Sequence, residues 1–272
     1  MNDAATPTDP KQSELLRTAR AVVACLRFES RRSLSIPRLA TWCLLALFPV
    51  GIVTVFRYFG EMPRPEVWAL MLFLLIPESM CLLGLLLWMA PHLQSELDGK
   101  TWPYLAVRPH GRLIVFLGKY LNAVVWTALA GLASLSICIY IAAPLMVDAG
   151  VMFQTLAALV VLSSMGYGAL YALFGVLIPK RATLIAVGYT LTGELLIGTL
   201  PAVVSEITFQ FHFRCLLRNW VDFTIGADET RLLFSEAPSW QHLAIIAGMI
   251  VGFLALGIWL IQVREYSIQD EA

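Results

Sequence analysis

The stretch that decides the fold is residues 68–92, WALMLFLLIPESMCLLGLLLWMAPH, in which Glu78 is the single charged side chain. A helix of about 20 mostly apolar residues is long enough to cross the ~30 Å hydrocarbon layer of a bilayer. The stretch exceeds that length and lacks the strict alternation of a barrel strand. It therefore predicts a membrane-spanning helix.

Apolar runs of the same kind recur on both sides of this stretch. Hydrophobic residues make up 58% of the 272 residues and charged residues 14%, whereas soluble domains carry about 25% charged residues. This composition excludes an ordinary soluble enzyme and a nucleic-acid-binding protein, and it makes the lipid bilayer the expected surroundings. With residues 68–92, the sequence predicts an all-α polytopic domain over 39–263 with six transmembrane helices, the other five being 39–59, 113–143, 151–178, 182–204 and 241–263.

The charges are distributed unevenly although they cancel, with 19 Lys and Arg against 19 Asp and Glu. With six spans, fourteen basic residues fall on the side of the two termini and five on the opposite side. Because cytoplasmic segments of membrane proteins are enriched in Lys and Arg, we expect both termini to be cytoplasmic. The segment 1–38 and the tail 264–272 then form the cytoplasmic ends.

Residues 11–36, before the first span, show apolar residues at helical spacing with basic residues between them. This pattern predicts an amphipathic helix at the membrane interface, which Pro37 should end. Its arginines can lie near anionic head groups, or the segment can be a simple topology anchor.

The segment 205–240 is the one long loop predicted on the external side. Residues 207–214, ITFQFHFR, alternate with period two, which alone would indicate a strand. Beside a membrane the same aromatic residues are also compatible with an interfacial helix or a re-entrant segment. We favour short helices at the interface.

The second cytoplasmic loop carries the most informative motif. Residues 94–120 read QSELDGKTWPYLAVRPHGRLIVFLGKY, with the spacing E-x4-T-x3-L-x3-P-x2-R-x6-K. The motif positions are Glu96, Gly99, Thr101, Leu105, Pro109, Arg112 and Lys119. Such a loop should form a short helix, a break bounded by proline and a basic return into the bilayer.

This spacing resembles the type-2 permease family of ABC exporters, and the six-span layout with an amphipathic N-terminal helix is similar to that family. The resemblance implies a multi-pass permease of the plasma (inner) membrane, with termini inside, paired with a cytoplasmic ABC ATPase subunit and with a second permease as homodimer or heterodimer. It implies that loop 94–112 is the coupling segment. The ATPase contacts would then be Glu96, Asp98, Lys100, Thr101, Trp102 and Tyr104. The chain departs from the family at residues 91–94, where PHLQ replaces an arginine-rich exit.

The chain itself is not expected to be an enzyme. Residues 99–101 spell GKT, but a phosphate-binding loop needs glycine at position 94, where Gln94 stands. The four histidines and five cysteines show no metal-ligand spacing, so neither a metal nor a cofactor is predicted. Two other functions stay open: a non-transporting anchor that transmits ATPase motion to an external partner, and an intramembrane enzyme.

Two acidic residues, Glu78 and Glu194, fall near the middle of predicted spans. An ionised carboxylate at the bilayer centre costs about 2.5–3.5 kcal/mol or more, so each should face the protein interior, be protonated or line water. Either both line a polar translocation route, or both are buried carboxylates that hydrogen-bond to neighbouring helices. In the resembling family, spans two and five flank the route, which favours the first alternative.

Overall fold

A computed structural model of the chain describes residues 10–59, 65–99, 102, 104, 110–142, 148–196, 206–221 and 237–264. Within these ranges every regular element is a helix and no strand occurs, which confirms the all-α prediction. Five helical stretches in them are long and apolar enough to cross a membrane: 36–59, 67–98, 111–142, 149–177 and 239–263.

The N-terminal part forms two helices, α1 (Pro10–Ser33) and α2 (Ile36–Phe59). The break between them lies at Leu34 and Ser35, so the prediction that Pro37 ends the first helix was wrong. Pro37 is instead the second residue of α2. Proline is tolerated in the first turn of a helix, where its missing N–H has no intrahelical acceptor.

The second stretch is built from three consecutive helical segments, α3 (Pro65–Phe73), η1 (Leu74–Met80) and α4 (Cys81–Trp88). The middle segment η1 is a π-helix and contains both Pro77 and Glu78. Proline cannot donate to the preceding turn, and the wider π-helical turn accommodates that loss. The Ser163 hydroxyl donates a hydrogen bond to the Pro77 carbonyl.

The rest of the chain packs around one central helix, α8 (Ala149–Leu177), which is buried along most of its length. It contacts α4, α7 (Gly111–Ala142), α9 (Ala182–Tyr189), α11 (Phe209–Val221) and α13 (Ser239–Val263). The segments η3 (Pro179–Arg181) and η4 (Thr190–Leu196) flank α9, and η4 is again π-helical. Of the predicted span 182–204, residues 182–196 are helical and the remainder lies outside the described residues.

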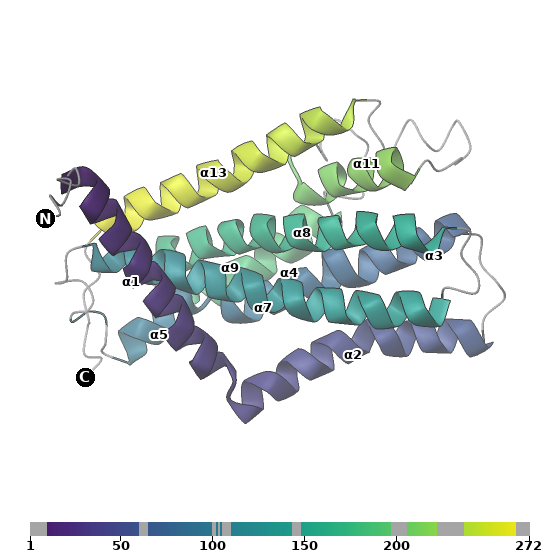
Figure 1. Cartoon of the computed structure of the whole chain (residues 1–272), viewed down its shortest axis with the longest axis horizontal. Coiled ribbons are helices and arrows are strands. Elements are labelled where there is room, and N and C mark those ends of the chain that lie inside the picture. Colours follow the sequence, from purple (N-terminus) through teal and green to yellow (C-terminus); the bar gives the residue numbers. More distant parts are fainter. Residues whose placement is uncertain are drawn as a thin grey trace, which may run out of the picture.

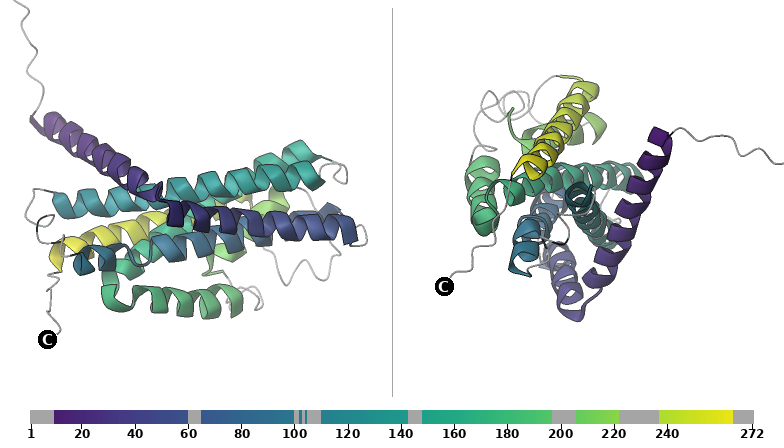
Figure 2. Two further views of the ribbon diagram at one scale, coloured as in Figure 1. Left: turned by 90° about the horizontal axis from the view of Figure 1, so that it is seen from below. Right: turned by 90° about the vertical axis from the view of Figure 1, so that its left-hand side faces the viewer.

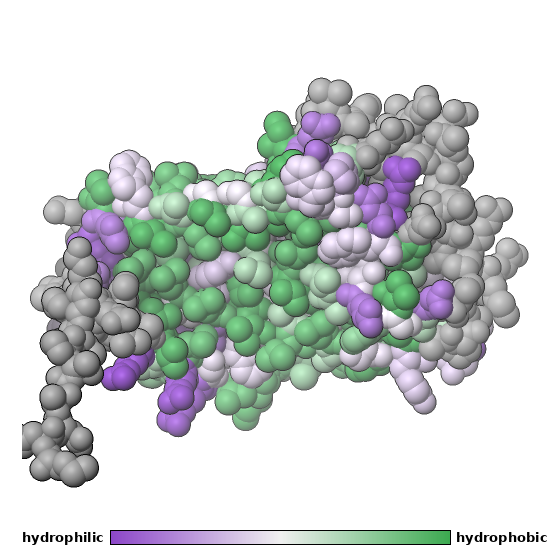
Figure 3. Space-filling view, turned by 45° about the horizontal axis from the view of Figure 1, so that its top comes forward, coloured by the Kyte–Doolittle hydropathy of each residue, from purple (hydrophilic) through white to green (hydrophobic). Residues whose placement is uncertain are grey.

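The long helices lie side by side along the longest axis of the molecule (Figure 1). Helix α1 crosses the others obliquely near one end, where it packs on α7 (Figures 1 and 2). The last turns of α13 and the short helix α5 (His92–Asp98) lie at the same end, whereas α3 and α11 lie at the opposite end. Apolar side chains form a broad band between hydrophilic groups near the two ends (Figure 3).

Helix α11 lies in the region where the sequence left strand and helix open, and it confirms the helix. Its first five residues, 209–213, are all buried. The alternation of aromatic and polar residues along them therefore does not mark one buried and one exposed face. The aromatic rings of Phe209 and Phe213 pack against Tyr167 of α8, while Phe211 packs against His242 of α13. Because neighbouring helices cover both faces of this turn, polar and apolar residues alike are enclosed.

Candidate functional site

The loop that carries the family motif begins with a sharp bend after α4. The backbone N–H of His92 and its side-chain Nδ1–H both donate to the Met89 carbonyl, over 3.2 and 2.7 Å. The Ser95 hydroxyl donates to the His92 carbonyl over 2.8 Å. These local bonds tighten the turn at residues 89–91 and direct α5 back toward α1 and α7.

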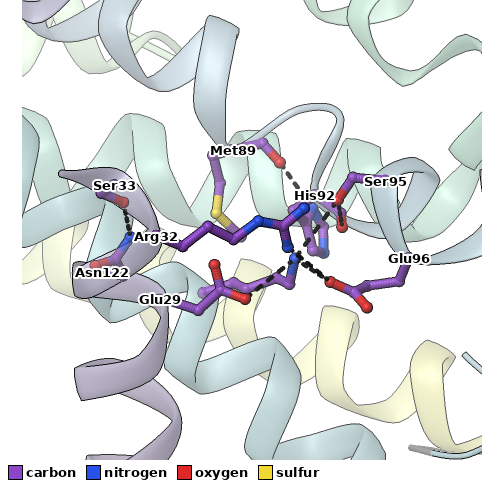
Figure 4. Close-up of polar contacts among 9 residues, drawn as sticks. Glu29, Arg32, Ser33, Met89, His92, Ser95, Glu96 and Asn122 are labelled. Carbon is purple, nitrogen blue, oxygen red and sulfur yellow. Dashed lines mark hydrogen bonds and ion pairs between the residues drawn. The ribbon is translucent and has the colours of Figure 1, made fainter. Parts of the chain in front are cut away.

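Glu29 of α1 and Ser95 and Glu96 of α5 lie close together in a polar cluster between these three helices (Figure 4). Lys119 of α7 contacts all three of these residues and is the centre of the cluster. Its Nζ lies 2.6 Å from Glu96 Oε1 of α5 and 3.6 Å from Glu29 Oε1 of α1. It also donates to Ser95 Oγ over 3.5 Å. We call Glu29, Arg32, Glu96 and Lys119 the Lys119 cluster.

The charges of the Lys119 cluster balance. Arg32 Nη1 lies 3.8 Å from Glu96 Oε1, so two carboxylates face two cations. The Glu29, Glu96 and Lys119 side chains are each exposed by 10% or less, whereas Arg32 is 47% exposed. Removing one member of a buried ion pair leaves its partner uncompensated, and that change is strongly destabilising. The cluster therefore fixes α1, α5 and α7 relative to one another.

A second set of hydrogen bonds joins α1 and α7 beside the Lys119 cluster. Ser30 Oγ donates to Asn122 Oδ1 over 2.9 Å, and Asn122 Nδ2 donates to Ser33 Oγ over 3.1 Å. Asn122 follows Lys119 by three residues and thus lies on the same face of α7.

The backbones of α1 and α7 approach closely at Gly118. A Cβ atom added there would lie 2.7 Å from Cys25 Sγ, so a larger side chain would displace α1. Burial, followed by the nearby Glu29 carboxylate, raises the pKa of the Cys25 thiol. Cys25 is therefore a packing residue with little thiolate character.

Two cavities flank the Lys119 cluster. One of about 230 Å³ is bounded by α1, α2, α4, α5 and α7, and its polar lining includes Glu29, Arg38, His92 and Asn122. The other, of about 310 Å³, lies between Cys25, Arg32 and Glu96. Water or a small polar group can reach the cluster from both sides.

The predicted ATPase contacts differ in exposure. Glu96 and Trp102 are buried, whereas Asp98 is exposed and Tyr104 is 78% exposed. Lys100 and Thr101 lie outside the described residues. Glu96 and Trp102 thus support the loop from inside, and Asp98 and Tyr104 present side chains to its surroundings.

The structure describes two of the remaining motif positions of the loop, Gly99 and Arg112. Leu105 and Pro109 lie outside the described residues, and Gly99 ends α5 as its C-cap. Arg112 reaches the end of α13, where its Nη1 donates to the carbonyls of Gln262 over 3.0 Å and of Ile261 and Arg264 over 3.4 Å. These C-terminal carbonyls have no intrahelical donor, so Arg112 caps α13.

The two predicted interior glutamates meet at one residue of α11. Gln210 Nε2 donates to Glu78 Oε1, and the Gln210 backbone N–H donates to Glu194 Oε2 over 3.3 Å. The hydroxyls of Tyr167 and Tyr189 each donate to Glu194 over 3.2 Å. We call Glu78, Glu194, Gln210, Tyr167 and Tyr189 the inner polar cluster.

Both glutamates of the inner polar cluster lie in π-helical segments, η1 and η4. A π-helical turn carries one more residue than an α-helical turn, and such segments occur often at functional sites. Glu78, Glu194 and Gln210 are all buried. Of the three alternatives open to these carboxylates, their burial agrees with a position facing the protein interior, and their place on a translocation route stays a prediction.

Sequence reasoning missed several partners in these clusters. Glu29 stands as an acidic residue among the arginines of α1, and this exception was the available signal. Gln210 was hidden in the alternating run of residues 207–214. Nothing in the sequence connects Tyr167 to Glu194, because that contact depends on how α8 packs against η4. Tyr189 precedes Glu194 by five residues, so its contact is local and follows from the π-helical turn of η4.

Within the described ranges, no group of three or more His, Cys, Asp or Glu side chains is arranged to hold a metal ion. Comparison of the chain with protein-family models, with curated proteins and with solved structures finds no match.

Proposed function

We propose that the chain is the membrane-spanning permease subunit of an ATP-driven ABC exporter, in which a separate cytoplasmic ATPase subunit supplies the energy. The observation that carries the proposal is the 2.6 Å contact between Glu96 and Lys119, the first and last charged positions of the family motif. This contact joins α5 to α7 and so ties together the two helices between which the motif loop runs.

The contacts of α1 support the same function. A coupling loop must transmit force, so its base has to be stiff. Glu29 and Arg32 of α1 extend the Glu96–Lys119 pair, and Arg112 joins the far end of the loop to α13. Motion imposed on the loop would reach α1, α7 and α13 together.

The exposed loop residues Asp98 and Tyr104 are the proposed contacts with the ATPase. Glu96 and Lys119 are positioning residues, because they are buried and act through the loop. The Lys119 end of the molecule then faces the cytoplasm of a plasma (inner) membrane, and a second permease copy, identical or related, completes the transporter. Glu78 and Glu194 would line the route, with α11 covering it.

Charge reversal at Asp98 tests this function in the full chain. We expect that the Asp98→Lys variant no longer copurifies with an ABC ATPase, which is recognised by the phosphate-binding loop in its sequence. The vanadate-sensitive ATP hydrolysis of the copurified ATPase should be lost as well. Asp148→Lys is the matched control, because Asp148 is also exposed but precedes α8 at the opposite end. Wild-type chain that binds no ATPase under conditions where it folds would refute the proposal.

An anchor that transmits ATPase motion without transport is the second candidate, and it is favoured by the dense packing of the inner polar cluster. Reconstitution of the chain and its ATPase into vesicles separates the two. ATP-dependent movement of any cargo across the vesicle membrane supports the permease, whereas hydrolysis without movement supports the anchor.

A further inference from the structure

Glu78 and Gln210 share an unbalanced set of hydrogen-bonding atoms. Gln210 Nε2 donates to Glu78 Oε1, yet Glu78 Oε2 and Gln210 Oε1 are both buried without a hydrogen-bond partner. Both of these atoms are acceptors when the glutamate is ionised. Burying an acceptor without a donor costs free energy of folding. One additional donor between the two residues would remove this cost.

A single proton supplies that donor. A neutral carboxylic acid carries an O–H donor beside a carbonyl acceptor, and a primary amide carries an N–H donor beside a carbonyl acceptor. Facing each other, the two groups form two antiparallel hydrogen bonds. A proton on Glu78 Oε2 can be donated to Gln210 Oε1, while the existing bond from Nε2 to Oε1 is kept.

We propose that Glu78 is a proton-binding site, in which its neutral acid forms a two-point pair with Gln210 and fastens α11 to η1. The proposal rests on these contacts and is independent of any transport function.

Glu194 provides the contrast within the same cluster. It accepts hydrogen bonds from two tyrosine hydroxyls and from the Gln210 backbone N–H, which satisfy an ionised carboxylate. Glu78 accepts one such bond. Because Gln210 bridges the two carboxyl groups, a proton on Glu78 also removes the repulsion between two like charges.

The other charged and titratable groups near Glu78 come from α11, η4, α8 and α4. Arg214 of α11 is a cation near Glu78, and Glu194 of η4 is a second carboxyl group near it. Tyr167 of α8 lies nearby, and Cys81 of α4 follows Glu78 by three residues. The second hydrogen bond of the acid–amide pair, which satisfies Glu78 Oε2 and Gln210 Oε1, is what favours the proton.

Loss of the proton has a structural consequence. Glu78 Oε2 and Gln210 Oε1 would then face each other as two acceptors, and the pair would lose one of its two hydrogen bonds. Helix α11 would be held less firmly. Cys215, which is fully buried on α11, is a native reporter of that release.

Infrared spectroscopy of the full chain in phosphatidylcholine nanodiscs tests the proton directly. At neutral pH we expect a carboxylic-acid carbonyl band that shifts in D₂O, is lost in Glu78→Gln and is retained in Glu194→Gln. Glutamine has the shape and hydrogen-bonding groups of the neutral acid, so this variant should fold. Full acid-carbonyl intensity in Glu78→Gln, or its loss in Glu194→Gln instead, would overturn the assignment.

Maleimide labelling of Cys215, quantified by peptide mass spectrometry, tests the release of α11. The rate in the wild type is divided by the rate in Glu78→Gln at each pH, which cancels the intrinsic reactivity of the thiol. We expect this ratio to be near one at neutral pH and to rise about fivefold at alkaline pH, as loss of one buried hydrogen bond predicts. A ratio that stays at one throughout would show that the pair does not hold α11.

Discussion

The Lys119 cluster and the inner polar cluster both bury two glutamates, but they satisfy them by different means. Lys119 and Arg32 face Glu96 and Glu29 as cations. The hydrogen bonds to Glu78 and Glu194 instead come from an amide, a backbone N–H and tyrosine hydroxyls, which are all neutral donors. In the Lys119 cluster carboxylates are paired with cations, whereas the contacts that define the inner polar cluster are hydrogen bonds from neutral groups.

This difference has a physical basis. A lysine or arginine stem can reach the cluster near the end of the bundle and keep part of its head group in contact with water, as the half-exposed Arg32 does. In the middle of an apolar bundle a second charged side chain would add its own desolvation penalty. Neutral donors on rigid aromatic or amide groups avoid that penalty.

The largest expected effect on stability comes from removing the charge of Lys119, the central cation of the Lys119 cluster. Lys119→Met leaves Glu29 and Glu96 buried beside an apolar side chain, and we expect the free energy of unfolding to fall by about 3–5 kcal/mol. Denaturant titration in detergent micelles measures the change. Arg27→Met is the control, because Arg27 is exposed on α1. Equal stability of the two variants would show that the Lys119 cluster is not an ion-pair network.

Gln210→Leu tests the inner polar cluster by removing the side-chain amide without adding a charge. We expect a loss of about 1–3 kcal/mol in the free energy of unfolding, because Glu78 keeps its burial and loses its donor. Gln241→Leu, at an exposed position of α13, makes the same chemical change without burial. If both variants unfold at the same denaturant concentration, the amide is not a significant partner.

A smaller loss of stability is expected from removing the tyrosine hydroxyls that donate to Glu194. Tyr167→Phe and Tyr189→Phe each remove one of the hydrogen bonds to Glu194, and each should lower the free energy of unfolding by about 1–2 kcal/mol. Tyr140→Phe, at a side chain that is 83% exposed, should change it little. Stability that is unaffected in all three variants would contradict hydrogen bonding as the means of holding Glu194.

The smallest expected effect is a pH dependence of the free energy of unfolding that arises from His212 of α11. His212 Nδ1 lies 2.9 Å from His242 Nδ1, and burial, followed by this neighbouring histidine, lowers the pKa of His212 from its ordinary value of 6.5. Below about pH 6.5 the unfolded chain takes up a proton that the folded chain does not, so the free energy of unfolding should fall with falling pH. Above that pH His212 contributes no dependence.

Thermal unfolding of the wild type and of His212→Gln, measured between neutral pH and about pH 5, checks the sign. The variant should show a shallower decrease in melting temperature on acidification. An equal or steeper decrease in the variant would mean that His212 is not the group responsible.

The helical class and the inward position of Glu78 and Glu194 were predictable because both follow from local composition. Apolar runs of sufficient length form helices wherever they pack, and a carboxylate in such a run must turn away from apolar surroundings. The short helix α5 also agrees with the short helix expected at the start of the motif loop, whereas the break expected at Pro109 lies outside the described residues.

Pairing between distant segments was not predictable in this way. Glu29 and Lys119 are 90 positions apart, and Glu78 and Gln210 are 132 positions apart, so their contacts depend on helix packing and rotation. The error at Pro37 has a local cause, since proline can open a helix as well as end one. The alternating run 207–214 misled because both faces of α11 are covered.

The Arg112 contact also has a consequence for biosynthesis. Arg112 donates to carbonyls about 150 residues further along the chain, at the end of the last long helix. During translation this guanidinium is made long before its acceptors exist, so the contact between Arg112 and α13 cannot form until α13 has been made. A chain truncated before residue 261 would lack these acceptors. The Arg112 contact therefore forms only in molecules that contain the end of α13. It lies next to the surface proposed to bind a partner.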